Sequence, residues 1–215
     1  QLSAKLVGEQ IRILLRNFPV AAIKTGLLGS AEVIREVAAA LESTTIPVVI
    51  DPVSIASTGD RLAEDGFENE LRKFIESRAN LVTPNRAEAQ QLLSRPIEDA
   101  RGSAIELSAN LGCAVLLKGG HFEGSESIDW LAQNQNAVPI SGLRIEGLDV
   151  HGTGCTYSAA IAAQLALGRE MVEAVRLARA YLHSTLANHL HWPALSGGKD
   201  VKALAHFAKP GQVLS

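Results

Sequence analysis

A glycine turn followed directly by an apolar helix is encoded by residues 148–163, LDVHGTGCTYSAAIAA. Gly152 and Gly154 permit a tight backbone turn, and the helix behind them directs free N–H groups and the positive end of its dipole at that turn. Cys155 lies in the first turn of the helix, where the same field favours the thiolate over the thiol. The stretch therefore predicts an anion-binding turn with a reactive group beside it.

A motif this short is ambiguous by itself, because small residues also begin helices that merely pack closely against a strand. Three other segments strengthen the prediction, since each places polar residues directly after an apolar strand. They are Asp51 after residues 46–50, TPNRAE at 83–88 after Leu81 and Val82, and KGGH at 118–121 after residues 114–117. In open parallel sheets, ligands bind outside the carboxyl ends of the strands. We therefore expect these segments and the glycine turn to share one edge of a sheet.

Helix and strand patterns alternate along most of the chain. Apolar residues recur at helical spacing in residues 3–16 and 31–41, and short runs typical of buried strands lie at 20–24 and 48–50. The alternation continues with helices near 62–77, 85–93, 97–111, 153–167 and 171–189, and with strands near 80–82 and 114–118. This order predicts an α/β fold with a parallel sheet.

The remaining segments predict an edge to that sheet and a C-terminal addition. Three short pieces, at 128–131, 137–139 and 143–145, have the texture of antiparallel edge strands. A loop at 196–199 precedes a predicted short helix at 201–207. Because no repeat, low-complexity tract or long linker divides the chain, we expect one domain over residues 1–215.

The composition is that of an ordinary globular protein, with 47% apolar and 20% charged residues. A net charge of −3 without a basic block argues against a general electrostatic grip on nucleic acid. The apolar runs are too short to span a bilayer, and residues 1–5 lack the layout of a signal peptide. Cys113 and Cys155 occur in different contexts, which argues against a disulfide framework. We expect a cytoplasmic protein that binds neither nucleic acid nor membranes.

The residue types at the strand ends suit phosphoryl transfer. Asp51 and Glu88 are hard oxygen ligands for Mg²⁺, the usual escort of nucleotide phosphates, and Asn85 could order its water. Lys118 could neutralise phosphate charge, while the glycines at 119 and 120 would let the backbone approach a nucleotide. Positioning and charge stabilisation of this kind supply most of the catalysis in phosphoryl transfer.

Each of these residues also has a purely structural interpretation. Asp51 precedes a proline and could be only a turn residue. Asn85 and Glu88 have the spacing of a capping box, so the pair could serve only to begin a helix. Lys118 could be an exposed strand end, and His121 is either a turn residue or a nucleotide-loop contact. The sequence alone leaves these alternatives open.

Five motifs occur in order along the chain. They are KTGLLGS at 24–30, DPV at 51–53, TPN at 83–85 with Glu88, KGGH at 118–121 and HGTGC at 151–155. Together they closely resemble the hydroxymethylpyrimidine phosphate kinases of thiamin biosynthesis, within the ribokinase-like superfamily. The resemblance implies a three-layer α/β/α fold with a mainly parallel central sheet and a short antiparallel edge. It also implies ATP-dependent phosphorylation of hydroxymethylpyrimidine phosphate and of hydroxymethylpyrimidine, both small-molecule substrates.

The resemblance also assigns a role to each part of the phosphate site. The catalytic residues are Gly152, Thr153 and Gly154, as the anion hole for the transferred phosphoryl group, and Cys155, as the base. ATP phosphates would lie over Lys118 and the glycine turn, with nucleotide contacts from Asn85, Gly119, Gly120, His121 and Thr153. Mg²⁺ would lie near Asp51 and Glu88.

The pyrimidine pocket would be lined by Leu27, Val53 and Cys155. Leu27 stands where the family often has Met, a volume-conserving exchange that should be tolerated. Most ribokinase relatives have Asp at the position of Cys155, so the thiol places the chain with the pyrimidine-kinase branch and the related pyridoxal-kinase branch. Pyridoxal kinase activity is therefore the nearest alternative.

One departure from the family concerns the start of the chain. Family members begin with a strand, a glycine-rich segment and a flap strand carrying a Gln, none of which precedes Gln1. We expect a longer gene product, the alternative being a non-catalytic remnant that binds a nucleotide or another ligand. Members of the superfamily often pair through sheet edges or flap strands, which suggests a homodimer.

Overall fold

The computed structural model describes residues 2–53, 66–119, 126–143, 145, 150–194 and 200–207. The helices are α1 (Ala4–Asn17), α2 (Ala31–Leu41), α3 (Phe67–Arg78), α4 (Arg86–Leu93), α5 (Ala100–Leu111), α6 (Thr153–Ala166) and α7 (Met171–Ala187). The strands are β1 (Ile23–Thr25), β2 (Val48–Ile50), β3 (Leu81–Val82), β4 (Ala114–Leu117), β5 (Glu126–Gln133), β6 (Asn136–Leu143), β7 (Leu190–Trp192) and β8 (Val201–Ala203).

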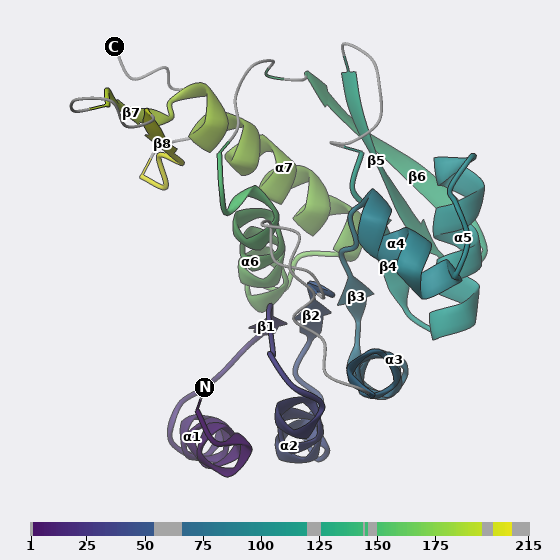
Figure 1. The fold of residues 1–215 in the computed structure, drawn as a ribbon, viewed down its shortest axis with the longest axis vertical. Helices are drawn as coiled ribbons and strands as arrows, with labels where there is room; N and C mark the ends of the chain where they lie inside the picture. The colour runs from purple at the N-terminus through teal and green to yellow at the C-terminus, as the bar shows by residue number, and fades with distance from the viewer. Residues whose placement is uncertain are drawn as a thin grey trace.

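A six-stranded sheet with the order β1-β2-β3-β4-β5-β6 forms the centre of the molecule. The first four strands are parallel, and the hairpin of β5 and β6 continues the sheet in antiparallel fashion. Because the parallel strands are added in one direction, right-handed crossovers place their helices on the same face. Figure 1 shows α1, α2 and α3 on one side of the strands and α6 and α7 on the other. The predicted three-layer α/β/α fold with an antiparallel edge is confirmed.

Two apolar cores lie on opposite faces of the sheet. In β2, Val48 and Ile50 point into the core beneath α2, α3 and α5, while Val49 points into the core beneath α6 and α7. All three side chains are fully buried. A parallel strand covered by helices on both faces has no solvent side, which is why such strands read as continuous apolar runs.

Side-chain caps fix where several helices begin. Ser30 accepts the N–H of Val33 at 3.2 Å, and α2 then spans the predicted residues 31–41. Asp99 accepts two N–H groups at the start of α5, so this helix begins at Ala100 and not at residue 97 as the periodicity predicted. Predicted ends elsewhere differ by a few residues; β1, for example, begins at Ile23 and not at residue 20.

The antiparallel edge is simpler than the sequence predicted. In place of three short pieces there are two strands of eight residues, paired along their whole length from Gln133–Asn136 to Glu126–Leu143. The turn consists of Asn134 and Gln135, both with positive φ. Polar residues that interrupt the apolar pattern are compatible with continuous pairing because main-chain hydrogen bonds define the ladder.

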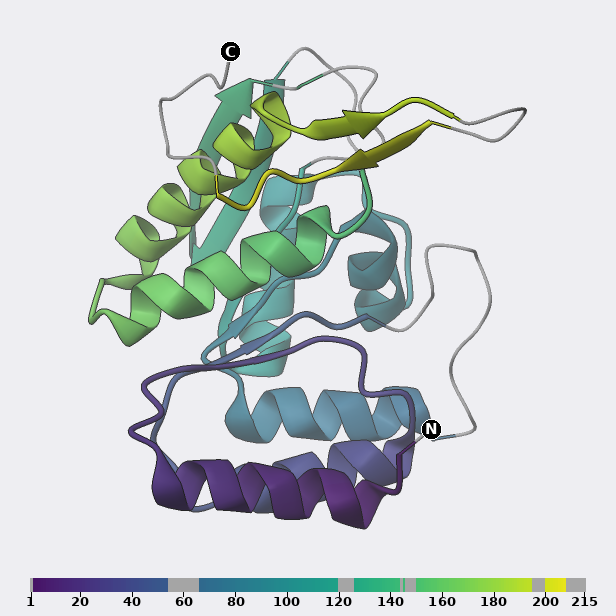
Figure 2. The ribbon, with the colours of Figure 1, turned by 90° about the vertical axis from the view of Figure 1, so that its left-hand side faces the viewer.

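The C-terminal prediction was wrong. Residues 201–203 form β8, and not the start of a helix; β8 pairs antiparallel with β7, a strand that the sequence did not predict. Figure 2 shows this hairpin projecting from the C-terminal end of α7. The predicted loop at 196–199 and residues 62–65 of the predicted third helix lie outside the described residues. Pairing with a distant strand overrides local preference in segments this short.

Within the described ranges, every helix is too short or too polar to cross a lipid bilayer.

The turn of the β5–β6 hairpin generates a stability prediction. Gln135 has a φ of 63°, a left-handed conformation that costs a side chain roughly 1 kcal/mol. Gln135→Gly should therefore raise the free energy of unfolding by about 1 kcal/mol, measured by chemical denaturation. The matched control, Gln133→Gly in the extended end of β5, should lower it by about 0.5–1 kcal/mol. Destabilisation by both changes would contradict the left-handed turn.

Candidate active site

A buried ion pair joins the carboxyl ends of β2 and β4. Lys118 Nζ donates to Asp51 Oδ1 at 2.8 Å, and the Asp51 side chain is only 2% exposed. The hydroxyl of Thr83, at the end of β3, donates to the same carboxylate oxygen at 3.1 Å. The side chains that directly follow three neighbouring parallel strands thus meet at one point, as the strand-end pattern predicted for Asp51 and Lys118.

Glu88 adds a second carboxylate to this cluster from the first turn of α4. Its Oε2 lies 4.0 Å from Lys118 Nζ and accepts the N–H of Asn85 at 2.7 Å. The Asn85 side chain in turn accepts the N–H of Glu88 at 2.9 Å. This is the reciprocal capping box that the spacing allowed. One Glu88 oxygen therefore both begins the helix and faces the ammonium group.

The glycine turn lies directly against the ion pair. Gly152 precedes α6 with a φ of 88°, a left-handed conformation that favours glycine. A Cβ atom added to Gly154 would lie 3.3 Å from Lys118 Nζ and 3.8 Å from Asp51 Oδ2. A larger side chain at position 154 would thus fill the space between the helix start and the ammonium group. Because Gly154 has no side chain, the N–H groups at the start of α6 and the Lys118 ammonium group face the same small space.

The two residues beside Gly154 differ in their environments. The hydroxyl of Thr153 donates to the carbonyl of Val150 at 2.8 Å, which closes the turn. Cys155 is a free thiol and is exposed. Behind it, Ser158 donates to the carbonyl of Gly154 at 3.0 Å and so ties the first turn of α6 together.

The electrostatics of the cluster are those of a site that binds ions. Burial raises the pKa of Glu88; the negative charge of Asp51 adds to this, while Lys118 and the Asn85 N–H oppose it. The ionised form of Glu88 is therefore held at a cost in free energy, which a nearby cation would relieve. On the opposite side, Lys118 and the start of α6 attract an anion. The arrangement can hold a cation and an anion side by side.

The donor set fits Mg²⁺. Asp51 and Glu88 supply carboxylate oxygens, and the Lys118 ammonium group beside both of them shows that their combined negative charge attracts a cation. No cluster of three or more acidic, His or Cys side chains suited to a metal occurs among the described residues. Mg²⁺ is usually bound by one or two carboxylates and completes its shell with water and phosphate oxygens. A pair of carboxylates beside an anion site meets that requirement.

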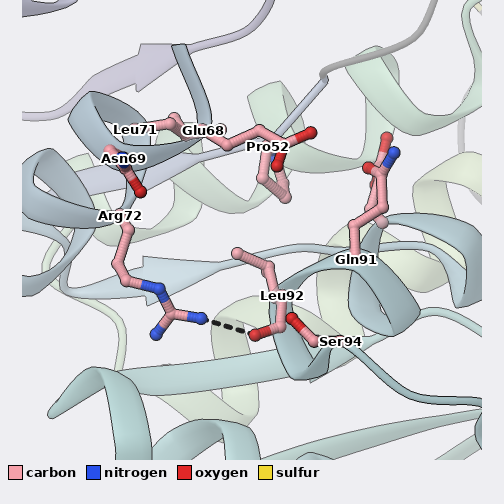
Figure 3. Close-up of a pocket in the computed structure, with 9 residues that line it drawn as sticks. Pro52, Glu68, Asn69, Leu71, Arg72, Gln91, Leu92 and Ser94 are labelled. Atoms are coloured by element: carbon pink, nitrogen blue, oxygen red, sulfur yellow. Dashed lines mark hydrogen bonds between the residues drawn. The ribbon is translucent and has the colours of Figure 1, made fainter. Parts of the chain in front are cut away.

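A small pocket of about 140 Å³ lies between α3 and α4, next to this cluster. Figure 3 shows its lining side chains, with Arg72 reaching across to the carbonyl of Leu92. Pro52 and Glu88 belong to the lining, so the pocket borders the acidic side of the site. Neither Leu27 nor Val53 lines it. It is therefore distinct from the substrate pocket that the sequence predicted.

Comparison with known proteins shows the family of the chain. The sequence model of a family described as phosphomethylpyrimidine kinase matches residues 1–198. The chain belongs to this family.

Two relatives illustrate the similarity within the phosphomethylpyrimidine kinase family. The chain is 37% identical over 190 residues to a hydroxymethylpyrimidine/phosphomethylpyrimidine kinase of Rhizobium meliloti, covering 86% of this chain and 71% of the relative. It is 36% identical over 205 residues to the protein of the same name from Synechococcus elongatus, covering 94% and 76%.

Solved structures share the fold. A pyridoxal kinase from Staphylococcus aureus in complex with AMP-PCP matches with a TM-score of 0.81 and 30% identity, covering 96% of this chain and 75% of that one. A phosphomethylpyrimidine kinase from Clostridium difficile matches with a TM-score of 0.71 and 31% identity, covering 85% and 76%. The fold is thus common to kinases of pyrimidines and of pyridoxal.

The structure brings together most of the polar residues that the sequence selected. Asp51, Glu88, Lys118 and the turn around Gly154 meet at one point. The alternative that Lys118 is an exposed strand end is wrong, since its side chain is 14% exposed. The capping interpretation of Asn85 and Glu88 is confirmed, and the nucleotide role of Asn85 stays a prediction.

Of the other predicted residues, three are described and two lie outside the described ranges. Gly119 is buried directly after Lys118. Gly120 and His121 lie outside the described residues, so their nucleotide contacts stay predictions. Leu27 follows β1 and is 52% exposed, and Val53 follows Asp51, its N–H donating to the Asp51 carbonyl at 2.8 Å. Both follow neighbouring strands at the same sheet edge.

Sequence reasoning missed the contribution of Thr83. Thr83 is 1% exposed, and its hydroxyl donates to the Asp51 carboxylate. The signal was available, because Thr83 follows β3 directly and stands opposite the end of β2 in the predicted parallel order. Only the strand order, which the sequence left open, shows that β3 lies between β2 and β4.

The raised pKa of Glu88 predicts how a neutral replacement acts. Above the ordinary glutamate pKa of about 4.3, the unfolded chain loses a proton that the folded protein retains, so stability falls as pH rises through this window. Glu88→Gln should therefore raise the Tm at about pH 7.5, and the gain should vanish near about pH 4. The same change should lower kcat by about tenfold or more, because it removes a charge from the ion site.

Glu70→Gln is the matched control for thermal unfolding at both pH values. A hydrogen bond from Lys73 lowers the pKa of Glu70, so ionised Glu70 stabilises the folded state at neutral pH. This variant should lower the Tm at neutral pH, opposite to Glu88→Gln. Equal and same-signed shifts in the two variants would contradict the assignment for Glu88.

Proposed function

We propose that the protein transfers a phosphoryl group from ATP to 4-amino-5-hydroxymethyl-2-methylpyrimidine phosphate, and to hydroxymethylpyrimidine, in the synthesis of thiamin diphosphate. The observation that carries the proposal is the contact of three elements: the Lys118–Asp51 ion pair, Glu88 at 4.0 Å from the same ammonium group, and Gly154 at the start of α6. Family membership and the names of the relatives support the choice of substrate.

The chain supplies charge and position for this reaction. Lys118 and the N–H groups at the start of α6 would hold the phosphoryl group that is transferred, with Gly152, Thr153 and Gly154 forming the hole. Asn85 and Gly119 would contact the nucleotide. Asp51 and Glu88 would hold Mg²⁺, which supplies neutralisation of phosphate charge when bound.

Cys155 would act as the base in this reaction. As the substrate oxygen forms its bond to the γ-phosphorus, the bond from that phosphorus to the bridging oxygen breaks and ADP leaves. The proton of the attacking oxygen would pass to the sulfur of Cys155. The exposure of Cys155 beside the glycine turn supports this role, because a base must reach the substrate directly.

The substrate assignment is tested by a panel. ADP release should be measured with ATP and Mg²⁺ and, separately, hydroxymethylpyrimidine phosphate, hydroxymethylpyrimidine and pyridoxal. We expect turnover on the two pyrimidines and a kcat/KM for pyridoxal at least about tenfold lower, as expected for a pocket whose polar groups would be left unpaired. Preference for pyridoxal, or turnover on none of the three, would overturn the proposal.

The role of Cys155 is tested against the other cysteine of the chain. Cys155→Ala should lower kcat by about a hundredfold or more while leaving the Kd for ADP unchanged, because general-base catalysis contributes that much. Burial raises the pKa of Cys113 to about 11 and keeps that thiol inert, so Cys113→Ala should leave kcat unchanged. Retained activity in Cys155→Ala would remove it from the base role.

We also propose that the protein is a homodimer and that it acts in the cytoplasm. Sedimentation of the purified chain at micromolar concentration should give the mass of a dimer, and a monomer would contradict that part alone.

A further inference from the structure

A second buried ion pair joins β5 to α7, and it contacts the phosphate site only through the backbone of Gly119. Asp129 on β5 is fully buried, and its Oδ2 accepts Arg179 Nη1 of α7 at 2.6 Å. Its other oxygen, Oδ1, accepts the backbone N–H of Gly119 at 2.7 Å. One carboxylate thus connects the last long helix to the peptide that follows Lys118.

Gly119 is pressed against β5 at this contact. A Cβ atom added to Gly119 would lie 1.8 Å from the carbonyl oxygen of Ile128, a distance that no side chain tolerates. On the preceding peptide, the Lys118 N–H donates to the carbonyl of Pro84 at 2.9 Å. The backbone that carries Lys118 is therefore held from the β3 side by Pro84 and from the β5 side by Asp129.

Arg179 extends the connection to the glycine-turn helix. Its Nη2 donates to the carbonyl of Ser127 at 3.0 Å, and its guanidinium carbon lies 6.0 Å from the ring centre of Tyr157 on α6. Gly142 on β6 leaves room for it, because an added Cβ would lie 3.2 Å from Arg179 Nε. Tyr157 is buried and follows Cys155 by two residues. The guanidinium thus lies between the Lys118 segment and the helix that begins at the anion hole.

The attraction between the two charges alone does not account for an ion pair in this position. Taking two charges out of water costs several kcal/mol, and well-packed apolar residues of similar size are often as stabilising. Burial raises the pKa of Asp129. Arg179, the Gly119 N–H, Tyr157 and Lys118 oppose that rise. What an apolar pair would lack is an acceptor for the Gly119 N–H and a donor for the Ser127 carbonyl.

We propose that Asp129 and Arg179 are positioning residues for phosphoryl transfer, which hold the Lys118–Gly119 backbone so that the ammonium group meets the glycine turn. The proposal rests on the function proposed above. It follows from geometry: Asp129 touches the peptide beside Lys118, Arg179 fixes Asp129, and neither residue is assigned a contact with substrate. Misplacement of a catalytic group by about 1 Å can lower a rate about a hundredfold.

Two paired variants separate positioning from loss of charge. Asp129→Asn with Arg179→Met removes both charges but keeps an oxygen that can accept the Gly119 N–H. Asp129→Leu with Arg179→Met removes the same charges and the acceptor as well. Because neither variant leaves a lone buried charge, both should fold, which thermal unfolding will verify. Arg12→Met with Glu36→Gln, which removes a partly exposed ion pair between α1 and α2, is the control for loss of an ion pair elsewhere.

We expect the Leu/Met variant to have a kcat about tenfold or more below that of the Asn/Met variant, with a KM for hydroxymethylpyrimidine phosphate that differs by less than about threefold. Its Kd for ADP should rise, because Lys118 is displaced, and the Gly119 amide should exchange its hydrogen faster in NMR spectra. The Arg12/Glu36 control should keep the wild-type kcat. If Asp129 and Arg179 had only a structural role, the Leu/Met variant would have a lower Tm than the Asn/Met variant but the same kcat.

Equal kcat values and equal ADP affinities in the two paired variants would overturn the proposal, even if their stabilities differ. A wild-type chain that binds ADP but turns over no pyrimidine would instead contradict the proposed function. In that case the ADP affinities and the exchange of the Gly119 amide still decide the positioning role: a difference supports it and equality overturns it.

Discussion

The Lys118 ammonium group is the constraint around which the candidate site is built. Two carboxylates, Asp51 and Glu88, are brought out of water at one end of the sheet, and without a cation between them their charges would repel. The strands supply the positions, because parallel neighbours end side by side. The surrounding residues fit around this group: Thr83 donates to Asp51, and a side chain at residue 154 would press against the ammonium group. The glycine turn and the ion pair are therefore two parts of one arrangement.

Glu88 shows how local structure and site chemistry share one group. Its carboxylate completes a capping box, a motif that needs a Glu or Gln side chain at this position of the helix. The same carboxylate is buried, and burial raises its pKa and so disfavours its charged form. Sites that bind ions often retain such electrostatic conflict, since the ligand relieves it. The capping interpretation and the metal interpretation of the sequence were not exclusive, because one oxygen can satisfy the helix while its partner stays available.

The sequence predicted the fold and the meeting of the strand ends because both follow from periodic patterns. Apolar runs define the strands, and Asp51 and Lys118 come directly after two of them, so their proximity needs only a parallel sheet. The pairing of Lys118 with Asp51 was not predicted, since it depends on side-chain geometry and on the place of β3 in the sheet. The Asp129–Arg179 contact was out of reach for the same reason: it joins residues of β5 and α7 that share no local pattern. The β7–β8 hairpin was missed because strands of three residues are too short to show a sequence pattern, and they form through their pairing with each other.

The order of the strands also bears on how the chain folds. β1 to β4 are added to the sheet in the order of the sequence, so each strand can dock on an edge that has already formed. Such neighbouring pairings close short loops, which keeps the entropic barrier to each addition low. α6 is the exception, because it packs back across β1 and β2, which lie far from it in the sequence. The second core and the anion-binding half of the site therefore form only when α6 docks on strands that lie more than a hundred residues earlier in the chain, which makes this docking the least local step in building the site.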